Sequence, residues 1–289
     1  MKISIITPIY NGNKYLNNYL KMIEDATSII SDVEVIWVND SPNIPIEYNK
    51  ELAKNIDLQI IENEKNLGIH KSRVNGLKQA KGEYILFLDQ DDEITKDALL
   101  SQYNKIQGYD LVIGNGYFED ENGSHKIFEN EYSLKFATRK KPYILVRDFI
   151  VSPGQCLIKK EAIPKEWKEN LLKNNGTDDF LLWLLMFNNN CKVTLNFECI
   201  YKHKYTGENV SLETDNMYKS QLELLEVLTQ NDTYNKKDLK KLERTIKYKH
   251  NYKTNFVKET LKNIDIFCYN IIYRAKWKGY TLPNGKNKK

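Results

Sequence analysis

Long apolar runs are missing from the sequence. No stretch approaches the roughly 18 to 20 continuous apolar residues that a helix needs to cross a bilayer. Residue 2 leads directly into the strand-like run ISII rather than into the apolar region of a signal peptide. We therefore expect a protein that is neither integral to a membrane nor secreted.

Cysteine, glycine and proline are also scarce, with 4, 13 and 7 residues among 289. The cysteines are far apart and form no C-x-x-C pair, so we expect reduced core thiols rather than disulfides or structural zinc. With 41% hydrophobic residues, the composition excludes disordered, collagen-like and low-complexity classes. The chain is long enough to bury one or two cores.

Charge is unevenly distributed along the chain. The net charge is +4, and residues 236–289 carry 16 Lys and Arg against 4 acidic residues, so residues 1–235 carry −8. The acidic body and the basic end therefore need separate explanations.

The first hundred residues alternate short β-branched runs with helical patterns, which is typical of βαβ units and a parallel sheet. We expect strands at 3–7, 33–38, 58–61 and 84–88, and helices at 14–30 and 71–80. Polar residues follow each strand. Because ligands bind at the carboxyl ends of parallel strands, these ends should converge on one site.

The pattern is looser after residue 92. Thr95 is expected to cap a helix through 107, and Asn122-Gly123 predicts a hairpin turn. Strands are expected at 110–114, 155–159, 192–195 and 199–201, a helix at 179–187, and helices almost throughout from 212. This indicates an α/β fold with an added antiparallel layer and a helical C-terminal extension.

The strongest local feature is the segment GEYILFLDQDD at 82–92, a buried strand that ends in three carboxylates. Such crowding is costly unless a cation offsets the repulsion, and oxygen ligands suit Mg²⁺ or Mn²⁺, which also bind phosphate oxygens. A diphosphate-bearing substrate fits this chemistry. The alternative is that the acids only cap the helix expected near Thr95.

Four segments in order, ITPIYN at 6–11, VIWVNDS at 35–41, NLG at 66–68 with Arg73 and Gly76, and the cluster at 89–92, resemble the nucleotide-sugar domain of family 2 glycosyltransferases. Residues 155–211 resemble the family more loosely. The resemblance implies a GT-A fold that is divided at 1–100 for the nucleotide sugar, 101–211 for acceptor and catalysis, and 212–289 for the basic helical region.

The resemblance also implies roles for seven donor-binding positions: Pro8 and Tyr10 beside the base, Asp40 on the nucleoside, Gly68 and Arg73 near the base and phosphates, Asp89 at the ribose, and Asp91 at Mn²⁺ or Mg²⁺ in a D-x-D motif. Surface packing for Tyr10 and a solvated helix position for Arg73 are the alternatives.

Asp178-Asp179, at the start of an apolar helix, resembles the family's acidic pair. By that match Asp179 is the catalytic base and Asp178 its neighbour; a helix cap at Thr177 or Asp178 is the alternative. His203, ahead of Asn209–Ser211, resembles a histidine that completes the metal shell, although a lone histidine is more often a surface or core residue.

We therefore expect a metal-dependent inverting hexosyltransferase that transfers a sugar from a nucleotide diphosphate donor, a UDP-sugar, to a glycan or lipid-linked glycan hydroxyl in surface polysaccharide or glycoconjugate synthesis. The processive Q-x-x-R-W motif is absent. A catalytically silent sugar-nucleotide or glycan-binding module on the same fold is the alternative. A nucleotidyltransferase is disfavoured because residues 7–12 contain a single glycine.

In the basic region, Ile264, Phe267, Cys268, Ile271 and Ile272 form an apolar stripe at helical spacing, flanked by lysine and arginine. We expect a cytoplasmic protein whose residues 236–278 contact an anionic membrane surface peripherally. Docking on the chain's own catalytic domain or on a second subunit of a homo-oligomer is the alternative. No nucleic-acid-binding module accompanies the charge, so nucleic acid is not expected.

Overall fold

The computed structural model describes residues 2–121, 123–205, 214–252 and 254–276. Its first half is a parallel sheet with strand order β3 (Asp57–Glu62), β2 (Val33–Asn39), β1 (Ile3–Ile9) and β4 (Tyr84–Phe87). β1 and β4 are buried along their whole length, as expected for strands covered on both faces. The four predicted strands are confirmed.

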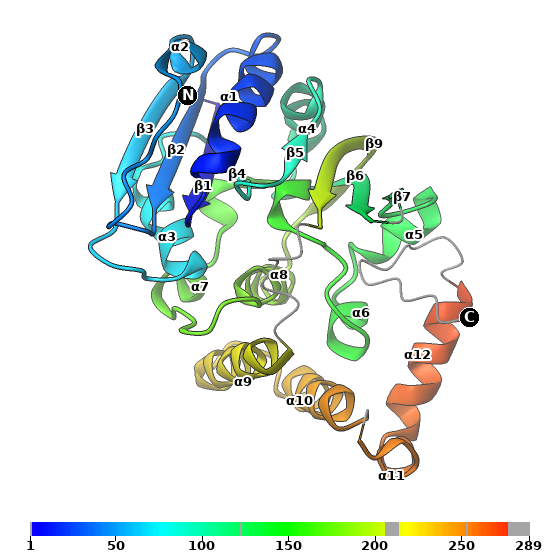
Figure 1. Cartoon of the computed structure of the whole chain (residues 1–289). Helices are drawn as coiled ribbons and strands as arrows, with labels where there is room; N and C mark the ends of the chain where they lie inside the picture. Colours follow the sequence, from blue (N-terminus) through cyan, green and yellow to red (C-terminus); the bar gives the residue numbers. More distant parts are fainter. Residues whose placement is uncertain (1, 122, 206–213, 253, 277–289) are drawn as a thin grey trace.

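Helices α1 (Asn13–Thr27) and α3 (Ile69–Gln79) connect these strands. α3 packs closely on β1 because Gly76 has no side chain. A β carbon at Gly76 would lie 2.4 Å from Cγ2 of Ile6 and 3.2 Å from Cγ2 of Val38. This close approach brings the first turn of α3 to the carboxyl ends of β1 and β2 (Figure 1).

The sheet continues beyond β4 through β8 (Cys156–Lys159), β6 (Leu111–Asp120), β9 (Val193–Lys204) and β5 (Glu93–Ile94), with β7 (Gly123–Lys126) paired to β6. β4, β8 and β6 pair antiparallel, and β6 pairs with β9 in parallel. The β6–β7 hairpin is the one predicted by the turn signal. The antiparallel strands thus extend the parallel sheet.

Two sequence expectations in this half were wrong in detail. α4 (Ala98–Ile106) begins after Asp97, so Thr95 does not cap it with its side chain. The two short strands expected at 192–195 and 199–201 are one strand, β9, because its register on β6 shifts on either side of Asn115 rather than breaking.

The remaining helical elements of the body are short, except for α8 (Asp178–Asn188), whose length and apolar burial match the predicted helix. The short ones are α2 (Lys50–Ala53), α5 (Glu131–Phe136), α6 (Lys140–Leu145), α7 (Lys165–Glu169) and the 3₁₀ turns Pro153–Gln155 and Lys160–Ala162.

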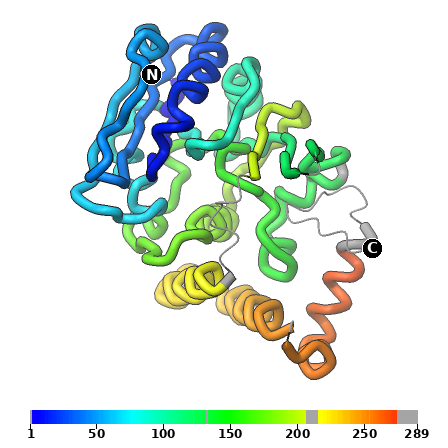
Figure 2. The backbone as a smooth tube through the Cα atoms, viewed as in Figure 1, coloured from blue at the N-terminus to red at the C-terminus, as the bar shows by residue number. Residues whose placement is uncertain are grey.

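The C-terminal part is helical, as expected: α9 (Thr214–Gln230), α10 (Lys236–Asn251), α11 (Phe256–Lys262) and α12 (Ile264–Lys276). These helices lie on the side of the molecule away from β1–β3 (Figures 1 and 2). None of the helices in the described ranges is long and apolar enough to span a bilayer. All four cysteines are unpaired, as expected, but only Cys156 is a core thiol. Cys191 and Cys199 are half-buried and Cys268 is exposed, so the expected core position is wrong for these three.

Candidate functional site

The carboxyl ends of the parallel strands meet as predicted. Beyond β1 and β4, the backbone N–H of Tyr10 donates to Oε1 of Gln90 at 3.0 Å, and Nε2 of Gln90 donates to the Tyr10 carbonyl at 3.1 Å. The backbone N–H of Asp40, after β2, donates to the carbonyl of Ile9 at 2.8 Å. Pro8 is buried within β1, whereas the ring of Tyr10 is 52% exposed at the rim.

Asp40 organises the loop that leads into α3. Its Oδ1 accepts from the Leu67 backbone N–H at 2.7 Å and from Nδ2 of Asn63 at 2.8 Å, and its Oδ2 accepts from the Gly68 N–H at 2.9 Å. Gly68 has φ +83°, a left-handed conformation that favours glycine. In this structure the buried Asp40 carboxylate therefore accepts hydrogen bonds from the chain itself.

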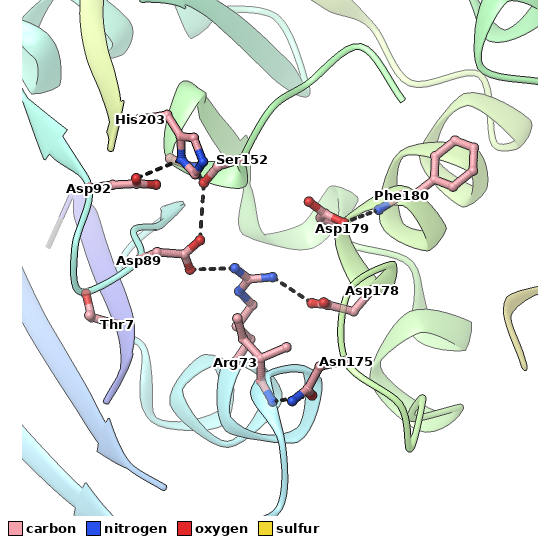
Figure 3. Close-up of polar contacts among 12 residues, drawn as sticks. Thr7, Arg73, Asp89, Asp92, Ser152, Asn175, Asp178, Asp179, Phe180 and His203 are labelled. Carbon is pink, nitrogen blue, oxygen red and sulfur yellow. Dashed lines mark hydrogen bonds and ion pairs between the residues drawn. The ribbon is translucent and has the colours of Figure 1, made fainter. Parts of the chain in front are cut away.

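Arg73 joins the two acidic segments (Figure 3). Its Nη2 lies 2.6 Å from Oδ1 of Asp89, and its Nη1 lies 2.7 Å from Oδ2 of Asp178. The side chains of Arg73 and Asp178 are 3% and 4% exposed. The alternative of a solvated helix position for Arg73 is therefore excluded, and its guanidinium is held by carboxylates of the chain.

The acidic pair lies in the first turn of α8, where Oδ1 of Asp179 accepts from the backbone N–H of Phe180 at 2.7 Å. The side chain of Thr177, the N-cap residue, makes no capping hydrogen bond; its hydroxyl bonds to that of Ser220 at 2.7 Å. Burial alone would raise the pKa of Asp178, but Arg73 and His70 bring it below its ordinary value. Burial and the neighbouring Asp178 instead raise the pKa of Asp179 to about 7. Asp179 is thus poised to accept a proton near neutral pH.

The acids that follow β4, at 89–92, interact with side chains of the site and do not cap a helix. Asp92 accepts a short hydrogen bond from the Tyr201 hydroxyl, and its Oδ1 lies 2.9 Å from Nδ1 of His203. Burial, and then the charges of Asp92 and Asp89, raise the pKa of Asp91 to about 7. Because α4 begins only at Ala98, capping does not account for these acids.

Of the two expected metal ligands, His203 contacts the Asp92 carboxylate and Asp91 is the residue before Asp92. Among the residues that the structure describes, no three His, Cys, Asp or Glu side chains are arranged as a metal site. The donor chemistry nevertheless fits a hard divalent cation, because Asp91 carries carboxylate charge that its neighbours Asp89 and Asp92 repel. Residues 209–211, expected after His203, lie outside the described residues.

A cavity of about 400 Å³ opens beside Asp179. Besides Asp179 and His203, it is lined by the segment that follows α6, including Asp148, and by α9 and α10, which contribute Gln221 and Lys249 among others. Burial and the charge of Asp179 raise the pKa of Asp148 well above its ordinary value. The cavity therefore joins the acidic pair to the helical region.

Sequence reasoning missed Asp148 and Ser152. The Ser152 hydroxyl donates to Oδ2 of Asp89 at 3.3 Å. Both residues lie in an irregular segment before β8 that has no strong periodicity. The turn signal Ser152-Pro153 was the available hint, because serine before proline favours turn initiation.

The fold and the site together define an α/β protein with a cluster of acidic side chains at the ends of its parallel strands. Residues 4–167 match the model of the family described as "Glycosyl transferase family 2". The chain belongs to this family, and its fold is the GT-A fold that the sequence resemblance implied.

Curated relatives and solved structures that resemble the chain include the following three. It is 35% identical over 121 residues to a poly(ribitol-phosphate) beta-glucosyltransferase of Bacillus spizizenii, covering 39% of this chain and 19% of that protein. It is 26% identical over 193 residues to a GalNAc(5)-diNAcBac-PP-undecaprenol beta-1,3-glucosyltransferase of Campylobacter jejuni. This match covers 64% of this chain and 60% of that protein.

The solved structure is that of Staphylococcus aureus TarS residues 1–349 in complex with UDP-GlcNAc, with a TM-score of 0.65, 20% identity, and coverage of 96% of this chain and 78% of that one. At this identity the likeness supports the fold. The chain spans 17% to 19% of the length of two of the curated relatives that it matches.

Proposed function

We propose that the chain is a metal-dependent inverting glycosyltransferase that moves a hexosyl group from a UDP-sugar to a hydroxyl of a glycan or lipid-linked glycan. The observation that carries this proposal is the Arg73 bridge, which holds Asp89 at the end of the sheet and Asp178 at the start of α8 on one guanidinium. The proposed donor residue Asp89 and the helix turn that carries the proposed base are therefore tied to the same side chain. The UDP-GlcNAc complex of TarS, a protein of the same fold, supports the donor class.

The acceptor class is supported by the names of the relatives, which act on poly(ribitol-phosphate) or on an undecaprenol-linked glycan. In this chain the cavity beside Asp179 is the proposed acceptor site. Its mixed lining of aromatic, apolar and polar side chains, with Tyr143, Phe180 and Gln221 among them, suits a glycan that offers both apolar faces and hydroxyl groups.

The proposed reaction is a single displacement. Asp179 takes the proton of the acceptor hydroxyl while that oxygen bonds to the anomeric carbon. The bond from the anomeric carbon to the diphosphate oxygen breaks, and the nucleoside diphosphate departs with the electron pair. Attack from the face opposite the diphosphate inverts the anomeric centre. Asp178, held by Arg73, fixes the first turn of α8 and with it the position of Asp179.

The donor would be bound by the rim and ends of the parallel strands. Tyr10 offers an exposed ring for the base beside buried Pro8, and Gly68 permits close approach of the backbone. Asp91, with His203, would hold Mn²⁺ or Mg²⁺, and such an ion supplies positive charge beside the departing diphosphate. Asp89 would face the ribose while it remains paired with Arg73.

The deciding experiment is nucleotide release from a panel of UDP- and GDP-sugars with Mn²⁺, Mg²⁺ or EDTA. Asp91→Asn and Asp179→Asn are compared with Asp57→Asn, a matched change at an exposed strand residue outside the site. Metal-dependent release with one donor, lost in both site variants and kept in the control, is expected. Failure of every sugar nucleotide to bind would refute the donor site.

A catalytically silent sugar-nucleotide or glycan-binding module is the second candidate, and the same assay separates it from the enzyme. It predicts donor binding without transfer for any acceptor offered, including lipid-linked glycans. The raised pKa of Asp179 favours the enzyme, because a binding module has no need of a proton acceptor at this position.

We further propose that the reaction takes place in the cytoplasm, at the inner face of the cell membrane, in surface polysaccharide or glycoconjugate synthesis. The undecaprenol-linked glycan in the name of the Campylobacter relative supports this setting. Enzyme in membrane and soluble fractions of lysed cells, measured before and after a high-salt wash, tests it.

A further inference from the structure

Exposed apolar side chains gather at one end of the molecule. Eleven large hydrophobic residues are exposed among the described residues, and six of them lie between 256 and 272. They are Phe256, Val257, Leu261, Ile264, Ile271 and Ile272, each between 49% and 69% exposed. We call this set the α11–α12 apolar face. Large exposed apolar side chains concentrated on two consecutive helices indicate an interaction site.

The structure distinguishes the two sides of α12. One side packs on the protein: Ile266 and Tyr273 are buried, the ring of Tyr273 meets that of Phe136 edge-on at 5.4 Å, and Nδ2 of Asn270 donates to the Leu145 carbonyl at 3.0 Å. The opposite side carries Ile264, Cys268, Ile271 and Ile272 at i, i+4, i+7 and i+8. Docking on the catalytic body therefore uses a different set of residues and leaves the apolar stripe facing outward.

The helices are also strongly basic. Residues 236–276 contain 12 Lys and Arg and 4 acidic residues. Lys258 and Lys262 are exposed on α11, next to Val257 and Leu261 in its sequence. Apolar side chains beside lysines are the pattern of a helix that lies in the plane of a membrane interface, where the apolar groups enter the lipid and the lysines meet anionic headgroups.

A second copy of the chain is the other occupant to consider. Two copies that met through this face would bring two strongly basic helical regions together, and like charges oppose such a contact. An anionic bilayer has the complementary charge. In Figures 1 and 2, α11 and α12 lie at the edge of the molecule, away from β1–β3.

We infer that the α11–α12 apolar face binds the surface of an anionic lipid bilayer and holds the protein there. This inference specifies the membrane contact in the proposed function, but it does not require the transfer reaction. α10, which contributes to the lining of the cavity beside Asp179, contacts α11. The proposed acceptor cavity and the proposed lipid-binding face are thus connected through α10.

The test is cosedimentation of the full chain with vesicles of phosphatidylcholine alone or mixed with phosphatidylglycerol. The triple variant Ile264→Asn, Ile271→Asn, Ile272→Asn removes apolar groups from the face. Ile44→Asn with Phe197→Asn removes exposed apolar groups elsewhere and serves as the matched control. Lys258→Gln with Lys262→Gln removes charge only. Circular dichroism and thermal melting verify that each variant is folded.

We expect the wild type to bind phosphatidylglycerol vesicles, and added salt to weaken this binding. The triple variant should lower the partition coefficient about tenfold or more, since each isoleucine contributes buried apolar area. The charge variant should lower it by several fold, and the control should not. UDP binding, measured in parallel without lipid, should be equal in all variants, so failure of lipid binding remains distinct from failure of the donor site.

Three results would overturn the inference. The first is a wild type that binds neither type of vesicle, and the second is a triple variant that binds as well as the wild type. The third is a dimer, detected by sedimentation equilibrium, that does not bind vesicles and that the triple substitution abolishes. This result would assign the face to a second copy of the chain.

Discussion

Nη1 of Arg73 lies 2.7 Å from Oδ2 of Asp178, and both side chains are almost wholly buried. The same guanidinium contacts Asp89 at 2.6 Å. Burial would lower the pKa of Arg73, but these carboxylates raise it above its ordinary value, so the arginine remains charged. One buried cation thus connects the sheet with the helix that carries the proposed base.

Arg73→Lys should impair both stability and turnover. A lysine ammonium cannot reproduce the fork that reaches two carboxylates, and breaking a buried ion pair costs about 3–5 kcal/mol when one partner is removed entirely. We expect a loss of about 1–3 kcal/mol in the free energy of unfolding and about 10- to 100-fold in kcat. Denaturant unfolding and nucleotide-release kinetics measure the two effects.

Lys78→Gln is the matched control for Arg73→Lys, because Lys78 is an exposed cation on the same helix. It should leave both quantities unchanged. Wild-type turnover and stability in Arg73→Lys would contradict the role given to the bridge.

The rate should rise with pH through about 7, because Asp179 must be deprotonated to accept the acceptor proton and its pKa is about 7. kcat/KM measured from pH 5 to 9 should show this acidic limb. Asp179→Asn should abolish the limb together with most of the activity, whereas Asp57→Asn should keep it. A profile that is flat across this range in the wild type would argue against Asp179 as the base.

The raised pKa of Asp179 also makes stability fall with pH, whereas the rate should rise. The pKa of Asp179 is higher in the folded chain than in the unfolded one, so the folded state binds more protons between about pH 4 and 7 and loses stability as pH rises through that window. Asp179→Asn should therefore melt at a higher temperature than the wild type at pH 8, with a smaller difference at pH 4. If the variant and the wild type differed in melting temperature by the same amount at pH 4 and pH 8, ionisation of Asp179 would not contribute to stability.

Chelation should stop nucleotide release reversibly. With EDTA we expect activity to fall at least about 100-fold and to return on addition of Mn²⁺ or Mg²⁺. Asp91→Asn should remain inactive at any metal concentration, and His203→Gln should need more metal for half-maximal activity. Full activity in EDTA would contradict the metal assignment of Asp91.

Gly76→Ala should destabilise the donor half of the fold. The added methyl would lie 2.4 Å from Cγ2 of Ile6, so α3 must move away from β1. Overpacking of this kind costs about 1–3 kcal/mol. Urea unfolding measures the loss, and Gln79→Ala, an exposed position at the end of the same helix, is the control. Unchanged stability would mean that the helix and sheet adjust without cost.

The first four strands could be predicted because buried parallel strands appear as short β-branched runs, and their polar ends then identify the site. β9 could not be predicted as one strand, because Asn196 and Glu198 interrupt its apolar pattern. The Arg73 bridge was also out of reach. Sequence spacing cannot reveal that an arginine on α3 reaches an acid more than one hundred residues away.

The buried side of α12 is a second feature that the sequence did not reveal. The sequence predicted one apolar stripe on this helix, but the helix also has apolar residues on its other side. Packing of Ile266 and Tyr273 against the body decides which stripe is buried. Hydrophobic spacing alone does not show which side of the helix packs on the rest of the protein, so this could not be predicted from the sequence.

The exposed thiol of Cys268 makes this part of the chain directly observable. It lies on the same side of α12 as Ile264, Ile271 and Ile272, while Cys156 is buried and Cys191 and Cys199 are partly covered. A polarity-sensitive fluorophore attached by brief maleimide treatment should therefore label this position first. Its emission would then report, in real time and without any substitution, when the helix passes from water into a less polar environment.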